Sequence, residues 1–270
     1  TVGRLEGRGV VCRFHGYRMS LHGDGVGPFC LRQYPALAIG GLVFAQIDGI
    51  DTGFREFATT LAKDHAYFPG FERNIKVAPQ MVIENAFDPS HLRPVHDVVE
   101  VEARGTVLEG DVLRTDTLLR VGPSAWEAGA SNCELVEVPI IFRAFSPYIV
   151  VARIAVGGGD KPHYTIATAM PLADGSSAMR LSVALPHLED GSRPPDNVAE
   201  ILLQFERMGV EQDSVIWESL SNIQPHYLPG DATVIDYRRW CERFRLDEKP
   251  GSVSLRPEAQ RAQHVLKSAR

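Results

Sequence analysis

The sequence predicts an α+β protein in which a small all-β unit precedes a larger domain, built on an antiparallel sheet and one long helix near the C-terminus. Three observations predict this class: glycine-rich turns between short strands at the start, alternating polar and apolar residues through the middle, and helical periodicity after Pro194-Pro195. At 270 residues and 44% hydrophobic, the chain is long enough for a large domain beside a small one.

Residues 1–48 are expected to form the all-β unit. Turns that contain glycine separate three short apolar runs, which are the expected strands at residues 10–12, 18–21 and 42–47. The first turn, at residues 7–9, arrives with no preceding strand to pair with, which suggests that part of the unit is missing from this chain. The stretch 48–51 is the expected boundary with the second domain.

Residues 49–270 are expected to form the larger domain. A short helix is predicted over 53–64, and a strand over 75–82 leads into a segment that contains two histidines. Alternating residues then predict an antiparallel sheet of six or seven strands, at 99–102, 112–121, 133–138, 139–144, 148–156, 164–171 and 179–185.

The longest helix is predicted from residue 197 to about residue 220. Asp196 or Asn197 is the expected N-cap, and Glu200 is placed for a capping box. A second, highly polar helix is expected at the surface over 256–270. A sheet wrapped around one long helix is a helix-grip arrangement.

The composition argues against several classes of function. A formal net charge of −6 and a pI near 5.9 disfavour a nucleic-acid binder, which would present a basic face. The longest weakly polar stretch, residues 34–47, is shorter than the about 20 residues that a membrane span needs. Residues 1–8 lack the pattern of a secretory signal. Four scattered cysteines favour reduced thiols and a cytoplasmic location.

The segment 84–96 contains the most informative residues of the chain. His91 and His96 are five positions apart, which on a straight helix turns them about 140° from each other. Pro94 disfavours helix at Arg93, so we expect the helix that carries His91 to end there and His96 to swing back. Two imidazoles at one point suit a divalent first-row metal, although a purely structural pair is the alternative.

One acid on the long helix is a candidate third ligand. The apolar stripe centred on Leu202 is expected to contain Val198, Phe205, Gly209, Ile216 and Leu220. At about 100° per residue, Asp213 falls about 20° from the centre of that stripe. A buried carboxylate costs several kcal/mol unless it is paired or coordinated, so Asp213 is the predicted ligand. Glu211 and Glu218 fall on the opposite side, in water.

Two imidazoles and one carboxylate form the facial triad that holds non-haem Fe(II) and leaves positions open for dioxygen. The same residues also suit zinc with a bound water, which would make the protein a zinc hydrolase. A third possibility needs no metal, because a sheet around a long helix also describes START-like modules that bind apolar ligands without catalysis. At this point all three stay open.

A second pair of metal-ligand residues lies near the start of the chain, where Cys12 and His15 are separated by two residues. Together with Asp24-Gly25, the segment 84–96 and the run Glu-Gln-Asp-Ser-Val-Ile-Trp at 211–217, this pair resembles the catalytic α subunit of the Rieske non-haem iron oxygenases. The resemblance extends over nearly the whole chain.

The resemblance implies two iron centres. Cys12 and His15 would supply half of the protein ligands of a [2Fe–2S] cluster, while His91, His96 and Asp213 would hold Fe(II). The family's first cluster pair, Cys-x-His, does not occur in the 270 residues. We therefore expect residues 1–48 to be a partial Rieske domain, with its N-terminal part absent from this chain, and residues 49–270 to be the catalytic domain.

The resemblance also implies roles for two residues between the centres. Asp88 would bridge them for electron transfer by hydrogen-bonding a cluster histidine, equivalent to His15, in a neighbouring chain, which leads to a head-to-tail homotrimer. Asn85, in the same motif, is a further catalytic candidate.

In this family, electrons from NAD(P)H pass through a reductase, often with a ferredoxin, and dioxygen then oxidises a small molecule, by default through hydroxylation. Asp213-x-x-Ile-Trp and the Tyr-Arg-Arg-Trp run at 237–240 are similar to the branch that acts on steroids and other large apolar molecules. Four strand residues are candidates for lining the pocket: Ile140, Phe142, Ile149 and Val151.

Overall fold

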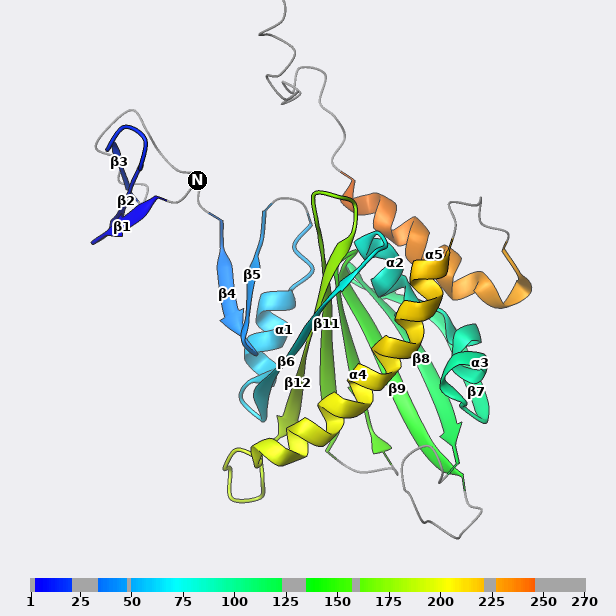
Figure 1. The fold of residues 1–270 in the computed structure, drawn as a ribbon. Helices are drawn as coiled ribbons and strands as arrows, with labels where there is room; N and C mark the ends of the chain where they lie inside the picture. Colours follow the sequence, from blue (N-terminus) through cyan, green and yellow to red (C-terminus); the bar gives the residue numbers. More distant parts are fainter. Residues whose placement is uncertain are drawn as a thin grey trace, which may run out of the picture.

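A seven-stranded antiparallel sheet with one long helix across its face dominates the structure (Figure 1). The structure is a computed structural model that describes residues 3–20, 34–47, 50–122, 135–156, 161–220 and 227–245. The long helix is α4 (Asp196–Ser219), and it contacts the sheet most extensively at β6 (His65–Ile75). The predicted α+β class, with a sheet around a long helix, is confirmed.

The seven strands follow the chain in order except for the first. The six others are β7 (Glu100–Glu109), β8 (Val112–Val121), β9 (Val136–Ser146), β10 (Ile149–Ile154), β11 (His163–Pro171) and β12 (Ser177–Pro186). Each of these pairs with the next, and β6 pairs with β12, so that β6 and β7 are the two edges of the sheet.

Two predicted strands, at 133–138 and 139–144, are one strand, β9. Pro139 does not end the strand, because its carbonyl still accepts a hydrogen bond from the Ala155 N–H at 3.2 Å. Residue 133 lies outside the described residues, as do Asp24-Gly25 and the helix expected over 256–270.

The strand predicted over 75–82 is wrong. The strand in this region is β6, which ends at Ile75, and residues 79–84 form helix α2 (Pro79–Glu84). Proline suits the first turn of a helix, because the backbone N–H that it lacks has no intrahelical partner there. Val82 and Ile83 of this helix are buried.

The N-terminal unit contains more strand than predicted. A three-stranded sheet is made of β1 (Arg4–Glu6), β2 (Gly9–Val11) and β3 (Arg18–Ser20), and a hairpin of β4 (Ala36–Ile39) and β5 (Leu42–Ala45) follows. The expectation that the first turn has no preceding strand is wrong, because β1 pairs with β2 around Gly7. Gly7 has a φ of 56°, which a glycine adopts without strain.

Helix α1 (Phe54–Leu61) confirms the short helix predicted over 53–64 and covers the face of the sheet opposite α4. Phe54 and Phe57 pack against Phe145, with ring centroids 5.3 and 4.9 Å away. Ile149 and Val151 belong to this cluster around Phe145, whereas Phe142 packs in the core beneath α4. Two of the four predicted pocket residues therefore lie on the face of the sheet away from α4, since neighbouring strand positions point to opposite sides.

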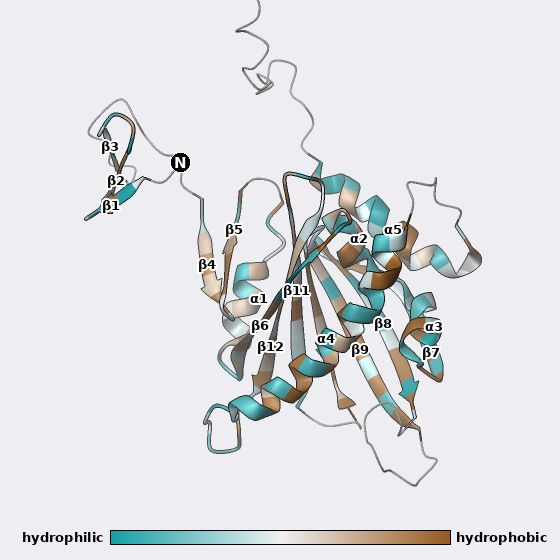
Figure 2. Cartoon of the chain, in the orientation of Figure 1, coloured by the Kyte–Doolittle hydropathy of each residue, from teal (hydrophilic) through white to brown (hydrophobic). Residues whose placement is uncertain are grey.

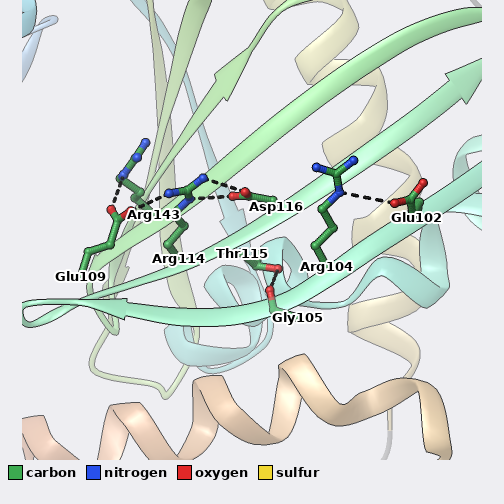
Figure 3. Close-up of polar contacts among 8 residues, drawn as sticks. All are labelled: Glu102, Arg104, Gly105, Glu109, Arg114, Thr115, Asp116 and Arg143. Carbon is green, nitrogen blue, oxygen red and sulfur yellow. Dashed lines mark hydrogen bonds and ion pairs between the residues drawn. The ribbon is translucent and has the colours of Figure 1, made fainter.

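The outer face of the sheet is solvated at β7, β8 and β9, where charged side chains pair across strands (Figure 3). Arg114 contacts Asp116 and Glu109, each at 2.6 Å, and Arg143 contacts Glu109 at 3.0 Å. Thr115, on the buried side of β8, instead donates to the Gly105 carbonyl at 2.9 Å. This division explains the alternation in β8 that predicted a strand. Figure 2 shows the same mixture of polar and apolar positions along these strands.

Helix α4 begins without the predicted cap. Its N-cap is Pro195, with no side-chain cap hydrogen bond, and the Asp196 carboxylate binds Arg193 at 2.9 Å instead. The predicted stripe is also rotated, because Val198, Ile216 and Leu220 are about half exposed. The residues buried against the sheet are Ala199, Val210, Asp213, Ser214 and Trp217, which centre about 60° from Leu202. Asp213 lies within both the predicted apolar stripe and the buried side that the structure shows.

Helix α5 (Ala232–Cys241) follows and packs beside α2 and the end of β7. None of the described helices is long and apolar enough to cross a membrane.

Candidate metal centre

Both histidines lie in the connection between the two edge strands of the sheet. After α2, this connection contains the 3-10 turns Asn85–Phe87 and Pro89–His91 and then helix α3 (Leu92–His96). The expectation that a helix ends at Arg93 is wrong, because α3 runs through Pro94. Proline is tolerated there since the first turn of a helix leaves its N–H groups without intrahelical partners. The change from 3-10 to α geometry after His91 brings the two rings together instead.

The structure brings His91, His96 and Asp213 together. One possible ligand atom from each lies within 4.8 Å of the other two. His96 Nε2 is 3.1 Å from Asp213 Oδ1, His91 Nε2 is 3.9 Å from the same oxygen, and the ring centroids are 5.2 Å apart. Asp213 is 8% exposed, so its carboxylate reaches the histidines from the buried side of α4.

Each imidazole is held through its other nitrogen. His96 Nδ1 lies 2.8 Å from Gln212 Oε1, and His91 Nδ1 is hydrogen-bonded to the Asp88 backbone carbonyl. An oxygen acceptor at Nδ1 favours the neutral tautomer that carries its proton there, in which Nε2 is unprotonated and able to bind a metal. No sequence pattern assigned a role to Gln212, an exposed polar residue beside the buried Asp213.

The surroundings shift the pKa values of the two histidines in opposite directions. For His96, burial alone lowers the pKa, but the hydrogen bonds with Asp213 and Gln212 outweigh it and raise the pKa above its ordinary value. For His91, burial prevails over the attraction of Asp213 and lowers the pKa. A neutral His91 beside the carboxylate is the form that binds a metal ion.

Asn85 lies inside the cluster. Its Nδ2 donates to Asp213 Oδ2 at 2.8 Å and is 3.2 Å from His91 Nε2. Asp88 lies on the outer side of His91, where one carboxylate oxygen accepts from the Ser90 N–H at 2.9 Å and the other is 3.9 Å from His91 Nδ1. The Asp88 side chain is 32% exposed, so it is open to a neighbouring molecule while it contacts the histidine.

Helix α5 fixes the segment that carries Asn85. Arg238 holds Glu84 through two contacts of 2.5 and 2.6 Å, and the Thr233 hydroxyl donates to the Phe87 carbonyl at 2.6 Å. The rings of Phe87 and Tyr237 stack with centroids 4.9 Å apart. The short turn around Asn85 is therefore anchored on both sides by α5.

Cys12 and His15 lie on the turn between β2 and β3. The turn is closed by the Cys12 N–H, which donates to the Tyr17 carbonyl at 2.8 Å, and by the Gly16 N–H, which donates to the Cys12 carbonyl at 2.9 Å. The His15 and Phe14 backbone N–H groups bind the Cys12 sulfur and lower the pKa of its thiol. A thiol with a lowered pKa and an imidazole three residues later on the same turn fit half of a Rieske ligand set.

Comparisons with known proteins identify the family of the chain. The family model described as 3-Ketosteroid 9alpha-hydroxylase C-terminal domain matches residues 46–245, about three quarters of the chain. No curated protein matches by sequence.

Solved structures share the fold at low identity. Dicamba monooxygenase bound to dicamba is 14% identical, with a TM-score of 0.65 and coverage of 90% of this chain and 81% of that one. NdmB of Pseudomonas putida CBB5 is 15% identical, with a TM-score of 0.60 and coverage of 89% and 73%. Dicamba monooxygenase with non-heme iron and dicamba is 14% identical, with a TM-score of 0.55 and coverage of 90% and 80%.

A long helix across an antiparallel sheet, with two imidazoles and a carboxylate gathered at its buried side, is the architecture of a Rieske non-haem iron oxygenase α subunit, an oxidoreductase. The chain belongs to the family of the 3-ketosteroid 9alpha-hydroxylase C-terminal domain. The resemblance to this class of oxygenase that was inferred from the sequence is confirmed.

Proposed function

We propose that this chain binds Fe(II) through His91 Nε2, His96 Nε2 and the Asp213 carboxylate. The convergence of the three donors, with both Nδ1 atoms held by oxygen acceptors, carries the proposal. Bound Fe(II) supplies the activation of dioxygen. The protein's part is to hold the donors on one side of the ion, so that the remaining positions face dioxygen and substrate.

The proposed reaction is the hydroxylation of a largely apolar small molecule. A C–H bond, O₂, two electrons and two protons give a C–OH bond and one water. The electrons come from NAD(P)H through a reductase, with or without a ferredoxin. The family is named for a steroid, and the buried, largely apolar face of the sheet beneath α4 supports a substrate of this kind.

For electron entry, we propose the arrangement that the sequence resemblance implies. Cys12 and His15 would supply one thiolate and one imidazole to a [2Fe–2S] cluster, in a partial Rieske domain at residues 1–48. Asp88 would connect that cluster with His91 across a subunit boundary in a homotrimer. The contact between Asp88 and His91 and the partial exposure of Asp88 support this role.

Metal analysis tests the iron site. Full-length protein reconstituted anaerobically with ferrous iron should hold about one mononuclear iron per chain, and Asp213→Ala should hold almost none. Glu211→Ala is the matched control, since Glu211 lies two residues away on the exposed side of α4 and pairs with Arg73 at 3.7 Å. Full iron retention in Asp213→Ala would refute the assignment.

The same preparations separate the alternatives. A zinc hydrolase would retain zinc and act without a reductant. A non-catalytic binding module would take up an apolar ligand without reductant-dependent oxygen uptake. Substrate-dependent oxygen uptake that requires both iron and a reductase supports the oxygenase.

A further inference from the structure

A second acid lies on the buried side of α4. Glu206 is seven residues before Asp213, which is two helical turns, so the two side chains lie on the same side of the helix about 10 Å apart along its axis. Leu202 and Leu203, four and three residues before Glu206, and Val210, four residues after it, are its neighbours on the helix surface, and all three contribute to the main core.

Glu206 has a single polar partner in the part of the chain that the structure describes. The Thr165 hydroxyl, on the α4-facing side of β11, donates to Glu206 Oε1 at 2.6 Å, and Thr165 itself is 5% exposed. No ion pair reaches Glu206 from the described part of the chain. Burial raises the pKa of Glu206, and the hydrogen bond from Thr165 opposes this shift only partly. The neutral carboxylic acid is therefore favoured.

The surrounding strands do not supply a compensating charge. Thr165 pairs with Ala152 on β10 and with Val183 on β12, and both are buried apolar residues. The other titratable residue on this side of β11 is His163, whose pKa burial lowers to about 4, so it is uncharged near neutral pH. The acid thus faces a largely apolar surrounding with one oxygen committed to Thr165.

A neutral carboxyl has one O–H donor, and Thr165 occupies only the acceptor oxygen. The Oε2 atom has no hydrogen-bond partner among the described residues. It is also not fully buried, because the one fully buried side-chain polar atom without a partner in the described part of the chain is His65 Nδ1. A donor of this kind, on the helix that also carries Asp213, is suited to a ligand that brings a hydrogen-bond acceptor into apolar surroundings.

We propose that Glu206 is a specificity-determining residue that donates a hydrogen bond from Oε2 to a carbonyl oxygen of the substrate. Thr165 is the positioning residue that fixes the other carboxyl oxygen. A rigid apolar molecule would thus be held by its carbonyl end, about two helical turns from the iron ligand Asp213. This assignment rests on the proposed oxygenase function and specifies which apolar substrates the site prefers.

Matched ligands and matched variants test the proposal. The probes are a 3-ketosteroid and its 3-deoxo counterpart with the same ring skeleton, and binding to full-length protein is followed by tryptophan fluorescence. Wild-type protein should bind the ketone about tenfold more tightly or better, the difference that one satisfied buried hydrogen bond provides. Glu206→Gln should keep this preference, because its amide N–H still donates. Glu206→Leu should abolish it, and the exposed control Glu211→Leu should not change it.

A second measurement does not depend on how the leucine variant folds. Infrared spectra of ligand-free wild-type protein at neutral pH should contain the C=O band of a protonated carboxyl that Glu206→Gln removes and the ketone shifts. Absence of that band would overturn the proposal, as would a ketone preference that persists in Glu206→Leu or is missing in wild-type protein.

These outcomes are separate from a failure of the oxygenase assignment, because binding and infrared spectra need no iron. If Asp213→Ala retained its iron, the oxygenase site would fail while the ketone preference could still be measured. If wild-type protein bound neither steroid, the carbonyl anchor would be overturned, whereas the iron content would still support the metal site.

Discussion

Two acidic residues on the same side of α4 have very different surroundings. Asp213 lies among two imidazoles and the Asn85 amide, whereas Glu206, two turns earlier, has only the Thr165 hydroxyl as a polar partner among the described residues. The helix supplies the same backbone and the same direction to both acids. The partners come from distant segments, the connection before β7 for Asp213 and strand β11 for Glu206. The chemistry of each acid is therefore decided by the side chains that the rest of the fold places beside it.

The same amide substitution at both acids should give the largest difference. Asp213→Asn should lose its iron and reduce substrate-dependent oxygen uptake to background, because a neutral amide replaces the only carboxylate ligand. Glu206→Gln should keep the iron of wild-type protein. Iron per chain and oxygen uptake with a reductase measure both effects, and equal iron in the two variants would remove the distinction between the acids.

The free energy of unfolding should depend on pH through His163, which lies two residues before Thr165 on β11. Burial lowers the pKa of His163 to about 4 from 6.5. The unfolded chain therefore binds this proton first, so stability is unaffected above about pH 6.5 and is lost as the pH falls toward 4, by up to about 3 kcal/mol. Urea unfolding of wild-type protein and His163→Gln across this range measures the difference. Parallel pH curves for the two proteins would contradict the prediction.

The contact that orients His96 should matter less than the ligand itself. Gln212→Leu removes the acceptor at His96 Nδ1 and should weaken iron binding about 10- to 100-fold. Gln204→Leu, on an exposed position of the same helix, is the control and should not change it. Competition with a chelator measures the affinities, and equal values for both variants would show that Gln212 does not orient the ligand.

The smallest effect is expected for the hydrogen bond between Thr165 and Glu206. Thr165→Val should lower the free energy of unfolding by about 1–3 kcal/mol, because it leaves the part-buried Glu206 carboxyl without that hydrogen bond. Adding Glu206→Leu should recover most of that loss, since two apolar side chains then replace the pair. Chemical denaturation of ligand-free protein measures both steps. A double variant less stable than Thr165→Val alone would mean that the acid has another partner.

The sequence predicted the parts of the site that follow from regular geometry. Helical rotation placed Asp213 on the buried side, although the stripe centre was misplaced by about 60° because exposed apolar residues such as Ile216 counted toward it. The same rotation puts Glu206 only about 40° from Leu202, so the periodicity contained a signal for this acid as well. An apolar stripe alone does not distinguish such a residue from a surface acid.

Other parts required the tertiary structure. Gln212 contacts His96 across 116 residues, and no local pattern predicts such a contact. Edge strand β6 was missed because polar residues such as Glu72 and Asn74 alternate irregularly along it, and its bulge opposite Leu181 disrupts the period. The pairing of β6 with β12, far apart in sequence, cannot be derived from either segment alone.

That pairing of β6 with β12 has a consequence for the order of folding. The sheet is complete only after β12 has been synthesised, and α4 follows it, so Asp213 emerges 128 residues after Asn85. Contacts of such long sequence separation form slowly, because chain entropy is lost before they stabilise the fold. During synthesis, His91 and His96 are exposed to cellular metals well before their carboxylate partner exists. We expect ferrous iron to enter only after α4 has been synthesised and packed, with competition from other divalent metals most severe before then.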